Sequence, residues 1–573
     1  MENFLYTLIS TTSIFIFSFF TVYFYFLIGN IFNYKINNNN TLNIKNIIYK
    51  CIIGLILISF IALITNFFVS LNKITNTIIY TSILVAVIFI KKKVYFKEAK
   101  IVLIIISLVN FFLIISSKVY TPDAGLYHLP FINILHEHKI ILGLSNLHFR
   151  FGHASILEYL NAINYNLIFN INGILIPQGI LCALIIVHFF NEVFNFFKKK
   201  ESANLNFFFS LFVLIFISLK VSKYSEFGND SAAHLLFFYL INVFLSDEKL
   251  SQTNKFTEFF LISSYIALIK IFMIFSILIP FIIFFNNLKK NLFNKKTFFV
   301  VFFIFLWIFK NILISGCLIY PIEKTCIKIL YWHNNKETIE QKISGEAWAK
   351  GWPQNQNSKL SQKEFIEDFN WLSAWKYHFN YIVNKLSIFF VIFFIILIIL
   401  FYIKKNKKIN FYNKNKNLKI YFLIIISAIG TSTWFLKAPL YRYGFSYPIS
   451  FIFLVTSHLL VTFYNFNIRS LNKLAQNIFF LCLTCIFLLQ LPKVIKNYQI
   501  KLTHNWPNIF LLNNKNEKID PLNKLIINGV TIYSNNNECW YSKAPCSNYE
   551  IHDLNINYYY SYLVINRIIN KDL

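Results

Sequence analysis

Long apolar runs separated by short polar stretches divide most of the chain. Several of them approach or exceed twenty residues, the length that an α-helix needs to cross the hydrocarbon core of a bilayer. Their repetition predicts an all-α polytopic membrane protein. The apolar runs cover about 4–28, 51–71, 75–90, 101–117, 171–190, 205–221, 232–246, 257–287, 298–316, 384–403, 420–436, 444–463 and 476–492.

One of these runs, 257–287, is too long for a single span and carries Lys270 near its middle. Because a lysine inside the bilayer is costly, the pattern favours a hairpin of two short helices that turns at Lys270. A lysine that reaches out to the interface would also fit this position. Counted in this way, the sequence predicts about fourteen transmembrane helices (13–14).

Basic residues orient these helices. The lysines concentrate in short loops, including "KKKVYFK" (91–97) and "KKNKKINFYNKNKNLK" (404–419). Such loops stay in the cytoplasm by the positive-inside rule, so both termini are expected outside. The segments 118–170, 222–231, 317–383, 437–443 and 493–573 then all face the outer side.

Composition supports this class and excludes others. The chain of 573 residues is 56% hydrophobic, with a mean hydropathy of +0.54, which does not fit a soluble domain. The net charge of +29 lies mainly in loops between spans, so no nucleic-acid partner is predicted. The first apolar run is too long for a cleavable signal peptide. The expected partner of most of the chain is therefore the lipid bilayer.

Two domains are expected. Residues 1–492 form the multi-span membrane domain, with large outer loops at 118–170 and 317–383. Residues 493–573 are more polar and include the strand-like stretch "GVTIYS" (529–534), which predicts a small extracytoplasmic C-terminal domain.

Cysteines separate into two groups by position. The first group lies within or at the ends of apolar runs, where reduced thiols are expected: Cys51, Cys182, Cys482 and Cys485. The second group lies in outer segments and supplies disulfide candidates: Cys317, Cys326, Cys539 and Cys546. Closure of "CWYSKAPC" by Cys539 and Cys546 is one possibility, and the sequence leaves three pairings open.

Polar chemistry is densest after the fourth run, in "YTPDAGLYHLPFINILHEHKIILGLSNLHFRFGH" (120–153), which holds five of the twelve histidines. Apolar residues at three-residue spacing from Leu126 predict a helix, with Pro130 in its first turn, and a second helix follows from Ile156. Both helices are expected to lie in the membrane interface. Asp123 stands at the head of this loop, where it fits a general base or a helix N-cap, two compatible roles.

A metal site is not supported by this loop. No HExxH motif is present, and the adjacent side chains of "HEH" (136–138) point in different directions on a helix. The expected cofactor is therefore none.

Further cations lie near the ends of later spans. Lys310 and Asn311 lie in "WIFKNILISGCLIYP" (307–321), and Arg442 and Tyr443 in "WFLKAPLYRYGFSYP" (434–448). A guanidinium at the membrane boundary grips a phosphate in bidentate fashion, although an ion pair or a lipid contact also explains it. With Asp123 as the catalytic candidate, the substrate-binding candidates are Tyr127, His128, Glu137, Arg150, Lys270, Lys310, Asn311, Arg442 and Tyr443.

In these features the sequence resembles the GT-C superfamily of polytopic glycosyltransferases, which use polyprenyl-phosphate-linked sugars. The resemblance rests on "DAGLYHLP" at the opening of the outer loop, the basic residues of the middle spans and the late turn "APLYRYGFSYP". It implies an inverting transfer to an envelope glycan, lipid or protein at the outer face of the bacterial inner membrane. Asp123 would be the base, and Arg442 the leading phosphate ligand, with Lys270 and Lys310 beside it. Many members have a second acid where this chain has Ala124 and Gly125, so a metal-dependent version is not implied.

Two other functions remain open. A transporter or flippase for a lipid-linked or anionic envelope substrate would use the same arginine and lysine, but it is expected to contain repeats and polar residues near the bilayer midplane. A structural envelope component would leave the intramembrane lysines unexplained. Tryptophans of the loop 330–383 would stack on sugars or, for most of them, anchor the interface: Trp332, Trp348, Trp352, Trp371 and Trp375.

Overall fold

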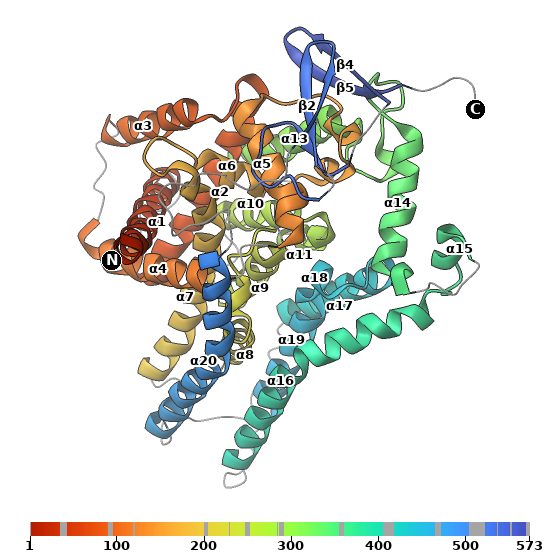
Figure 1. The fold of residues 1–573 in the computed structure, drawn as a ribbon. Helices are drawn as coiled ribbons and strands as arrows, with labels where there is room; N and C mark the ends of the chain where they lie inside the picture. The colour runs from red at the N-terminus through yellow and green to blue at the C-terminus, as the bar shows by residue number, and fades with distance from the viewer. Residues whose placement is uncertain are drawn as a thin grey trace.

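The computed structural model is predominantly helical, with a few strands near the C-terminus (Figure 1). Within its described part, eight helices are long and apolar enough to cross a bilayer, and five shorter apolar helices accompany them. This agrees with the predicted multi-pass, mainly α-helical membrane protein. The structure describes residues 2–34, 43–89, 96–117, 121–199, 204–228, 230–246, 253–283, 285, 292–354, 360–404, 418–463, 472–503, 522–535, 537–549 and 553–568. Much of the basic loops that orient the spans, including 90–95 and 405–417, lies outside these residues.

The helices follow the predicted apolar runs closely. The first half comprises α1 (Glu2–Tyr34), α2 (Ile44–Phe68), α3 (Lys73–Phe89), α4 (Phe96–Ser116), α5 (Leu129–Glu137), α6 (Ile156–Ile163), α7 (Ile176–Lys199), α8 (Leu205–Ser218), α9 (Asp230–Ser246) and α10 (Thr253–Ile269). The second half comprises α11 (Leu278–Ile283), α13 (Lys295–Ser315), α14 (Asn335–Ala349), α15 (Gln362–Ile366), α16 (Leu372–Lys404), α17 (Leu418–Lys437), α18 (Tyr441–Gly444), α19 (Ser446–Phe463) and α20 (Asn472–Thr503). Short 3₁₀ or π turns include η1 (Ala124–His128), η3 (Phe149–His153), η5 (Val221–Lys223), η6 (Ile271–Ile277) and η8 (Glu323–Thr325).

Helices α1 and α2 pack closely because each offers a glycine to the other. A Cβ on Gly54 would overlap the carbonyl of Tyr25, and a Cβ on Gly29 would overlap the carbonyl of Lys50. Small residues at such crossings let backbones approach where lipid gives no hydrophobic driving force. These two glycines therefore fix the spacing of the first two helices.

The run 257–287 folds as a hairpin, as predicted. Helix α10 ends at Ile269, and the chain returns as η6 and α11. The returning helical segment packs against α10, with the ring centroids of Phe281 and Phe256 5.7 Å apart. The hydroxyl of Ser276 also donates to the backbone carbonyl of Ser263 at 2.9 Å. Lys270 lies at the turn.

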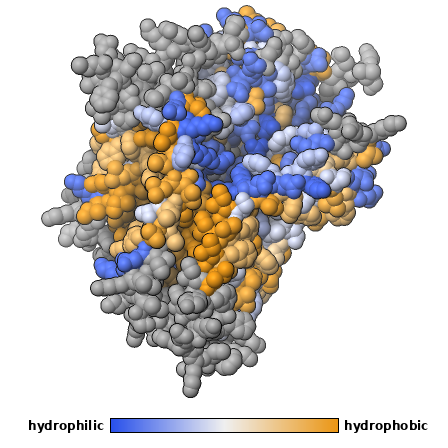
Figure 2. Space-filling model, turned by 60° about the horizontal axis from the view of Figure 1, so that its bottom comes forward, coloured by the Kyte–Doolittle hydropathy of each residue, from blue (hydrophilic) through white to orange (hydrophobic). Residues whose placement is uncertain are grey.

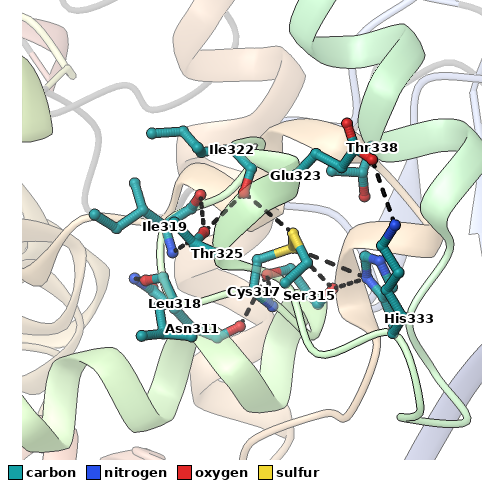
Figure 3. The surroundings of a disulfide bond; sticks show 12 residues. Asn311, Ser315, Cys317, Leu318, Ile319, Ile322, Glu323, Thr325, His333 and Thr338 are labelled. Atoms are coloured by element: carbon teal, nitrogen blue, oxygen red, sulfur yellow. Dashed lines mark hydrogen bonds and ion pairs between the residues drawn. A yellow bond between two sulfur atoms is a disulfide. The ribbon is translucent and has the colours of Figure 1, made fainter.

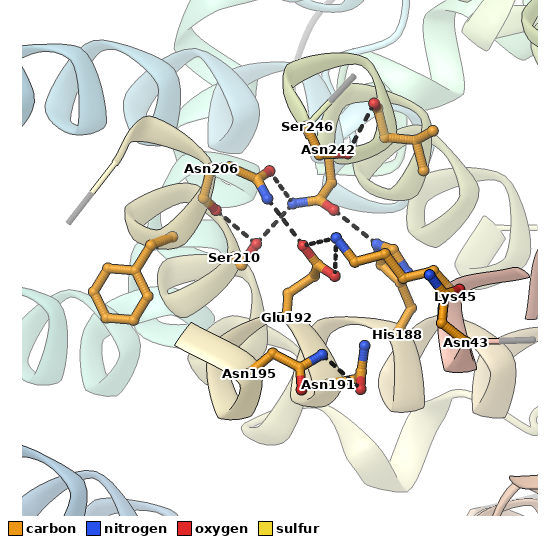
Figure 4. Close-up of polar contacts among 12 residues, drawn as sticks. Asn43, Lys45, His188, Asn191, Glu192, Asn195, Asn206, Ser210, Asn242 and Ser246 are labelled. Carbon is orange, nitrogen blue, oxygen red and sulfur yellow. Dashed lines mark hydrogen bonds and ion pairs between the residues drawn. The ribbon is translucent and has the colours of Figure 1, made fainter. Parts of the chain in front are cut away.

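A polar network joins α7, α8 and α9 to the start of α2 (Figure 4). Lys45 and Asn206 both donate to Oε2 of Glu192, at 2.8 and 3.0 Å. The amide of Asn242 donates to Asn206 and Ser210, both at 2.7 Å, and its oxygen accepts from His188 at 2.7 Å. Each polar group in the interior of a membrane helix bundle needs such a partner. The network thus joins four helices at the end that the sequence predicts to lie inside.

The first outer loop differs from the expectation that its helices lie in the membrane interface. Every residue of α6 is buried, and so is every residue of α5 except Glu137. Protein covers them on both sides, with α2 and α7 against α6 and the C-terminal residues against α5. The apolar stripe read as lipid-facing is therefore a protein core.

The C-terminal residues form two small sheets. The strands are β1 (Asn523–Ile527), β2 (Val530–Ser534), β3 (Cys546–Ser547), β4 (Leu554–Tyr559) and β5 (Tyr562–Arg567). The order β1-β2-β3 makes one sheet and β4-β5 the other. The predicted strand "GVTIYS" corresponds to β2. Helix α20 continues to Thr503, so the strands begin well after the expected boundary at residue 493.

The described surface separates by polarity. Figure 2 shows a hydrophobic zone that adjoins a hydrophilic zone. Helices α16 and α20 belong to the apolar class, and most of their apolar side chains are exposed in the isolated chain. An exposed apolar surface of this extent is typical of helices that contact lipid.

The glycine contact between α1 and α2 gives a direct test. Gly54→Ala should destabilise the protein by about 1–3 kcal/mol, because the new methyl group has no room against the Tyr25 backbone. Thermal unfolding in detergent micelles measures this change. Gly345→Ala is the matched control, since nothing lies within 4 Å of its Cβ position in α14. Alanine there should be neutral or stabilise by about 0.5–1 kcal/mol. Equal unfolding temperatures for both variants would contradict the tight crossing.

Candidate functional site

The centre of the site is an ion pair between Asp123 and Arg442. Asp123 follows α4 and opens η1, whereas Arg442 lies on the one-turn helix α18 between α17 and α19. Nη1 of Arg442 donates to Oδ2 of Asp123. The two side chains are 25% and 34% exposed, so the pair is accessible from one side. Asp123 makes no side-chain capping bond to η1, and of its two predicted roles the structure therefore does not support the N-cap.

A second ion pair lies against the first. Lys270, at the turn of the hairpin, donates to Oδ1 of Asp230, the first residue of α9. Its ammonium also donates to the backbone carbonyl of Arg442 at 2.7 Å. That contact joins the hairpin, α9 and α18 in one charged cluster.

His234 contacts the same backbone carbonyl of Arg442 as Lys270 does. Its Nε2 lies 3.0 Å from the carbonyl oxygen of Arg442, and its Nδ1 lies 2.7 Å from the hydroxyl of Ser446. Because a carbonyl oxygen only accepts, Nε2 carries the proton and Nδ1 accepts from the serine. His234 and Lys270 therefore both hold the peptide of Arg442, which positions its guanidinium.

Aromatic rings surround the cations. The guanidinium of Arg442 lies 5.6 Å from the ring centroid of Trp348 and 5.3 Å from that of Tyr443. The ammonium of Lys270 lies 4.8 Å from the ring of Tyr443, and Arg150 lies 4.8 Å from the ring of Tyr127. Such cation–π contacts hold the charges in place without neutralising them. Trp348 is 42% exposed, which leaves ring surface free for a ligand.

Electrostatics keep Asp123 ionised. Burial raises the pKa of its carboxyl, but the guanidinium of Arg442 and, more weakly, the charges of Arg150 and His128 outweigh burial. The pKa of Asp123 therefore lies below its usual value, and the residue is a carboxylate at neutral pH. Two carboxylates, Asp123 and Asp230, face three cations, Arg150, Lys270 and Arg442. The excess positive charge suits an anionic ligand.

Most of the predicted site residues gather here: Asp123, Tyr127, His128, Arg150, Lys270, Arg442 and Tyr443. The ring of His128 lies against that of Tyr127, with centroids 4.2 Å apart, while its Nδ1 lies 2.8 Å from Oε1 of Glu158. Pairing with that buried acid orients the ring.

The other three predicted residues make structural contacts elsewhere. Lys310 is buried and donates to the carbonyl of Ala154 at 2.7 Å. Asn311 donates to the carbonyl of Leu318 at 2.9 Å, and Glu137 accepts from the backbone of Ala544 at 3.3 Å. They hold the outer loops and the C-terminal residues in place.

Asp230, His234 and Trp348 belong to the cluster but were not predicted as site residues. Asp230 lies in "GNDSAAH" (228–234), directly before an apolar helix, as Asp123 does. This position, which Asp230 shares with Asp123, could have indicated from the sequence that Asp230 belongs to the site. For Trp348 the sequence offered stacking and anchoring equally, and the contact with Arg442 depends on folding.

The C-terminal residues close over the loop that carries Asp123. The backbone N–H of Trp540 donates to the carbonyl of Gly125 at 2.9 Å, and a Cβ on Gly125 would lie 2.7 Å from the indole ring. The Tyr541 hydroxyl lies 2.6 Å from Nδ1 of His136. Glycine is required at this position because the indole lies directly on the backbone.

Two disulfides stabilise the outer segments. Cys317 pairs with Cys326, and Cys539 pairs with Cys546, which resolves the three pairings that the sequence left open. Within the described chain, the group of possible metal ligands comprises Cys317, Cys326 and His333, with ligand atoms within 4.8 Å of one another (Figure 3). Because both sulfurs are joined to each other, they supply no thiolate to a metal.

Comparison with known proteins identifies a family for most of the chain. A model of the family described as "Domain of unknown function (DUF8201)" matches residues 10–449 of the chain. The range includes both ion pairs. Neither the curated proteins nor the solved structures contain a match.

The Asp123–Arg442 pair predicts a pH dependence of stability. A carboxyl with a lowered pKa stabilises the folded state above its unfolded pKa, about 3.9, and this contribution disappears as the pH falls through the folded value. Asp123→Asn should therefore lower the free energy of unfolding by about 1 kcal/mol at pH 7, and the difference from wild type should shrink as the pH falls below about 3.9 and vanish below the folded pKa. Denaturant titrations in micelles at several pH values measure it. Glu323→Gln, from the exposed pair with Lys328, should change stability less at pH 7. A loss that does not depend on pH would contradict the ion-pair explanation.

Proposed function

The chain belongs to the DUF8201 family, and we propose that it is an integral-membrane glycosyltransferase of the GT-C type. It transfers a sugar from a polyprenyl-phosphate donor to an envelope acceptor, with inversion, at the outer face of the bacterial inner membrane. The observation that carries this proposal is the partly exposed Asp123–Arg442 pair within a cluster of excess positive charge.

The cations of the cluster suit the donor phosphate. Arg442 presents a planar guanidinium that grips two phosphate oxygens, and Lys270 and Arg150 lie beside it as further positive charges. The negative charge of the phosphate grows as it leaves the sugar. Fixed cations at that point stabilise the transition state more than the ground state.

Asp123 takes the role of general base. The acceptor hydroxyl attacks the anomeric carbon, the carbon–oxygen bond to the phosphate breaks with its electron pair remaining on the phosphate, and the acceptor proton passes to Asp123. In the free protein Arg442 keeps the pKa of this carboxyl low, which makes it a weak base. A bound phosphate competes for Arg442, so donor binding raises the basicity of Asp123 when it is needed.

The exposed ring of Trp348 and the ring of Tyr443 support the sugar. Aromatic faces bind the C–H face of a pyranose while leaving its hydroxyls to polar groups. The two acids of the cluster, Asp123 and Asp230, are paired with Arg442 and Lys270. The proposed transfer therefore relies on side-chain cations.

The proposed topology has about fourteen spans with both termini outside. Contacts between distant segments predicted to lie outside support it, since 121–170, 317–333, 437–443 and the C-terminal strands meet at one end of the molecule. The Glu192 network, which contains Lys45, lies at the opposite end of the helices.

A transporter for a lipid-linked or anionic substrate is the second candidate. The observation that favours it is the polar Glu192 network, which places buried polar groups at a second depth in the helix bundle (Figure 4). The enzyme explains the accessible carboxylate beside Arg442 more directly. The following experiment separates the two.

The test uses purified protein in liposomes, radiolabelled polyprenyl-phosphate sugars and a membrane extract as acceptor. Asp123→Asn should reduce the transfer rate about 10²–10⁴-fold, because the acceptor loses its base. Arg442→Ala should raise the donor KM and lower kcat together. Lys437→Ala is the matched control, since this cation of the same outer turn is 64% exposed and pairs with Glu346.

Both outcomes are informative. Wild-type transfer that persists in a folded Asp123→Asn variant would exclude that residue as the base. If none of the donors is transferred but labelled lipid crosses the bilayer in an Arg442-dependent way, the transporter is the correct function.

A further inference from the structure

Four lysines from distant segments lie close to one another near Tyr441 of α18. Lys220 and Lys223 follow α8, Lys385 lies on α16 and Lys493 lies on α20. Helix α8 contacts both α16 and α20, which brings these segments together. We name this group the lysine cluster. The mechanism proposed above uses none of its members.

Two of the ammonium groups, those of Lys220 and Lys385, lie over the ring of Tyr441. The Nζ atoms of Lys220 and Lys385 lie 5.5 and 4.7 Å from the ring centroid of Tyr441. Lys220 also donates to the backbone carbonyl of Lys385 at 2.9 Å, and Lys385 donates to the hydroxyl of Tyr381 at 2.9 Å. A snorkelling lysine extends its ammonium group toward water. The side chains of Lys220 and Lys385 instead both lie against the ring of Tyr441.

The cluster is rich in uncompensated charge. Burial and then the charges of Lys385, Lys223 and Lys493 lower the pKa of Lys220 to about 7. Glu226 supplies a carboxylate charge to Lys385 and Lys493, which leaves one acid against four lysines. Like charges held this close destabilise a protein unless an anion lies between them.

The surroundings indicate a lipid. Lys385 and Lys493 lie within the apolar helices α16 and α20, next to exposed apolar side chains such as Ile388 and Leu489. In the membrane these side chains face acyl chains, so the lysines stand at the lipid boundary. An anion that arrives there carries its own acyl or prenyl chain.

We propose that the lysine cluster binds the phosphate of a membrane lipid head group, at a site separate from the Asp123–Arg442 pair. Tyr441 and Arg442 are neighbours on α18, and their side chains serve the two sites. A lipid bound at the cluster therefore packs against the helix that presents Arg442. The proposal does not depend on the transfer reaction.

The test measures thermal unfolding of the full chain in nanodiscs. Nanodiscs of phosphatidylcholine alone are compared with nanodiscs in which phosphatidic acid replaces part of it. Wild type should unfold at a higher temperature with phosphatidic acid, because the ligand binds the folded state. Lys223→Gln and Lys385→Gln should need at least tenfold more phosphatidic acid for the same increase.

Unfolding temperatures without phosphatidic acid distinguish a lysine that binds lipid from one that only stabilises the fold. Lys223 makes no side-chain hydrogen bond in the described structure, so Lys223→Gln removes charge alone. Without phosphatidic acid it should unfold at the wild-type temperature or above, because repulsion is relieved. Lys324→Gln, an exposed outer lysine, is the control and should keep the full response to lipid.

Three results would overturn the proposal. One is a lower unfolding temperature for both cluster variants without lipid, together with an unchanged response to phosphatidic acid, which would make the cluster structural. Another is a response lost in Arg442→Gln and kept in the cluster variants, which would place the lipid at the first site. The third is an equal, lysine-dependent increase with inorganic phosphate, which would identify a free anion as the ligand.

Discussion

The pairing of charges at Arg442 is the constraint on which the outer half of the molecule depends. A guanidinium that is two-thirds enclosed needs partners, and Asp123 lies 319 residues earlier in the chain. Meeting this need brings together the end of α4, the start of α9, the hairpin turn at Lys270 and the one-turn helix α18. The helices between them can adopt only arrangements that let these four points converge.

The two ends of the helix bundle differ in whether their charged side chains are balanced by partners. Around Glu192, lysine and amide donors satisfy the carboxylate, and the network is a structural contact. At the end that contains Arg442, cations outnumber acids both around this residue and at the lysine cluster. Proteins tolerate a local excess of positive charge at sites where an anionic ligand neutralises it. Such sites lower the stability of the ligand-free protein and are retained for their function. Excess charge therefore distinguishes the end proposed to hold the functional site from the end that the Glu192 network holds together.

Sequence reasoning predicted those features that local pattern determines. Apolar runs predicted the helices, and the intramembrane Lys270 predicted the hairpin. Residue type and position predicted that Asp123 and Arg442 belong to one outer site. The burial of α5 and α6 was not predicted, because an apolar stripe is the same whether it faces lipid or protein. The contacts of Asp230 and Trp348 were also missed, since they depend on long-range pairing rather than on neighbours in the sequence.

The contact between Trp540 and Gly125 has a consequence for biogenesis. Asp123 emerges from the ribosome long before Trp540, whose indole covers its loop. The loop consequently reaches its final conformation only when the membrane domain is complete. A chain truncated before Trp540 would insert its helices yet leave the loop of Asp123 uncovered, so assembly itself delays the appearance of a finished site.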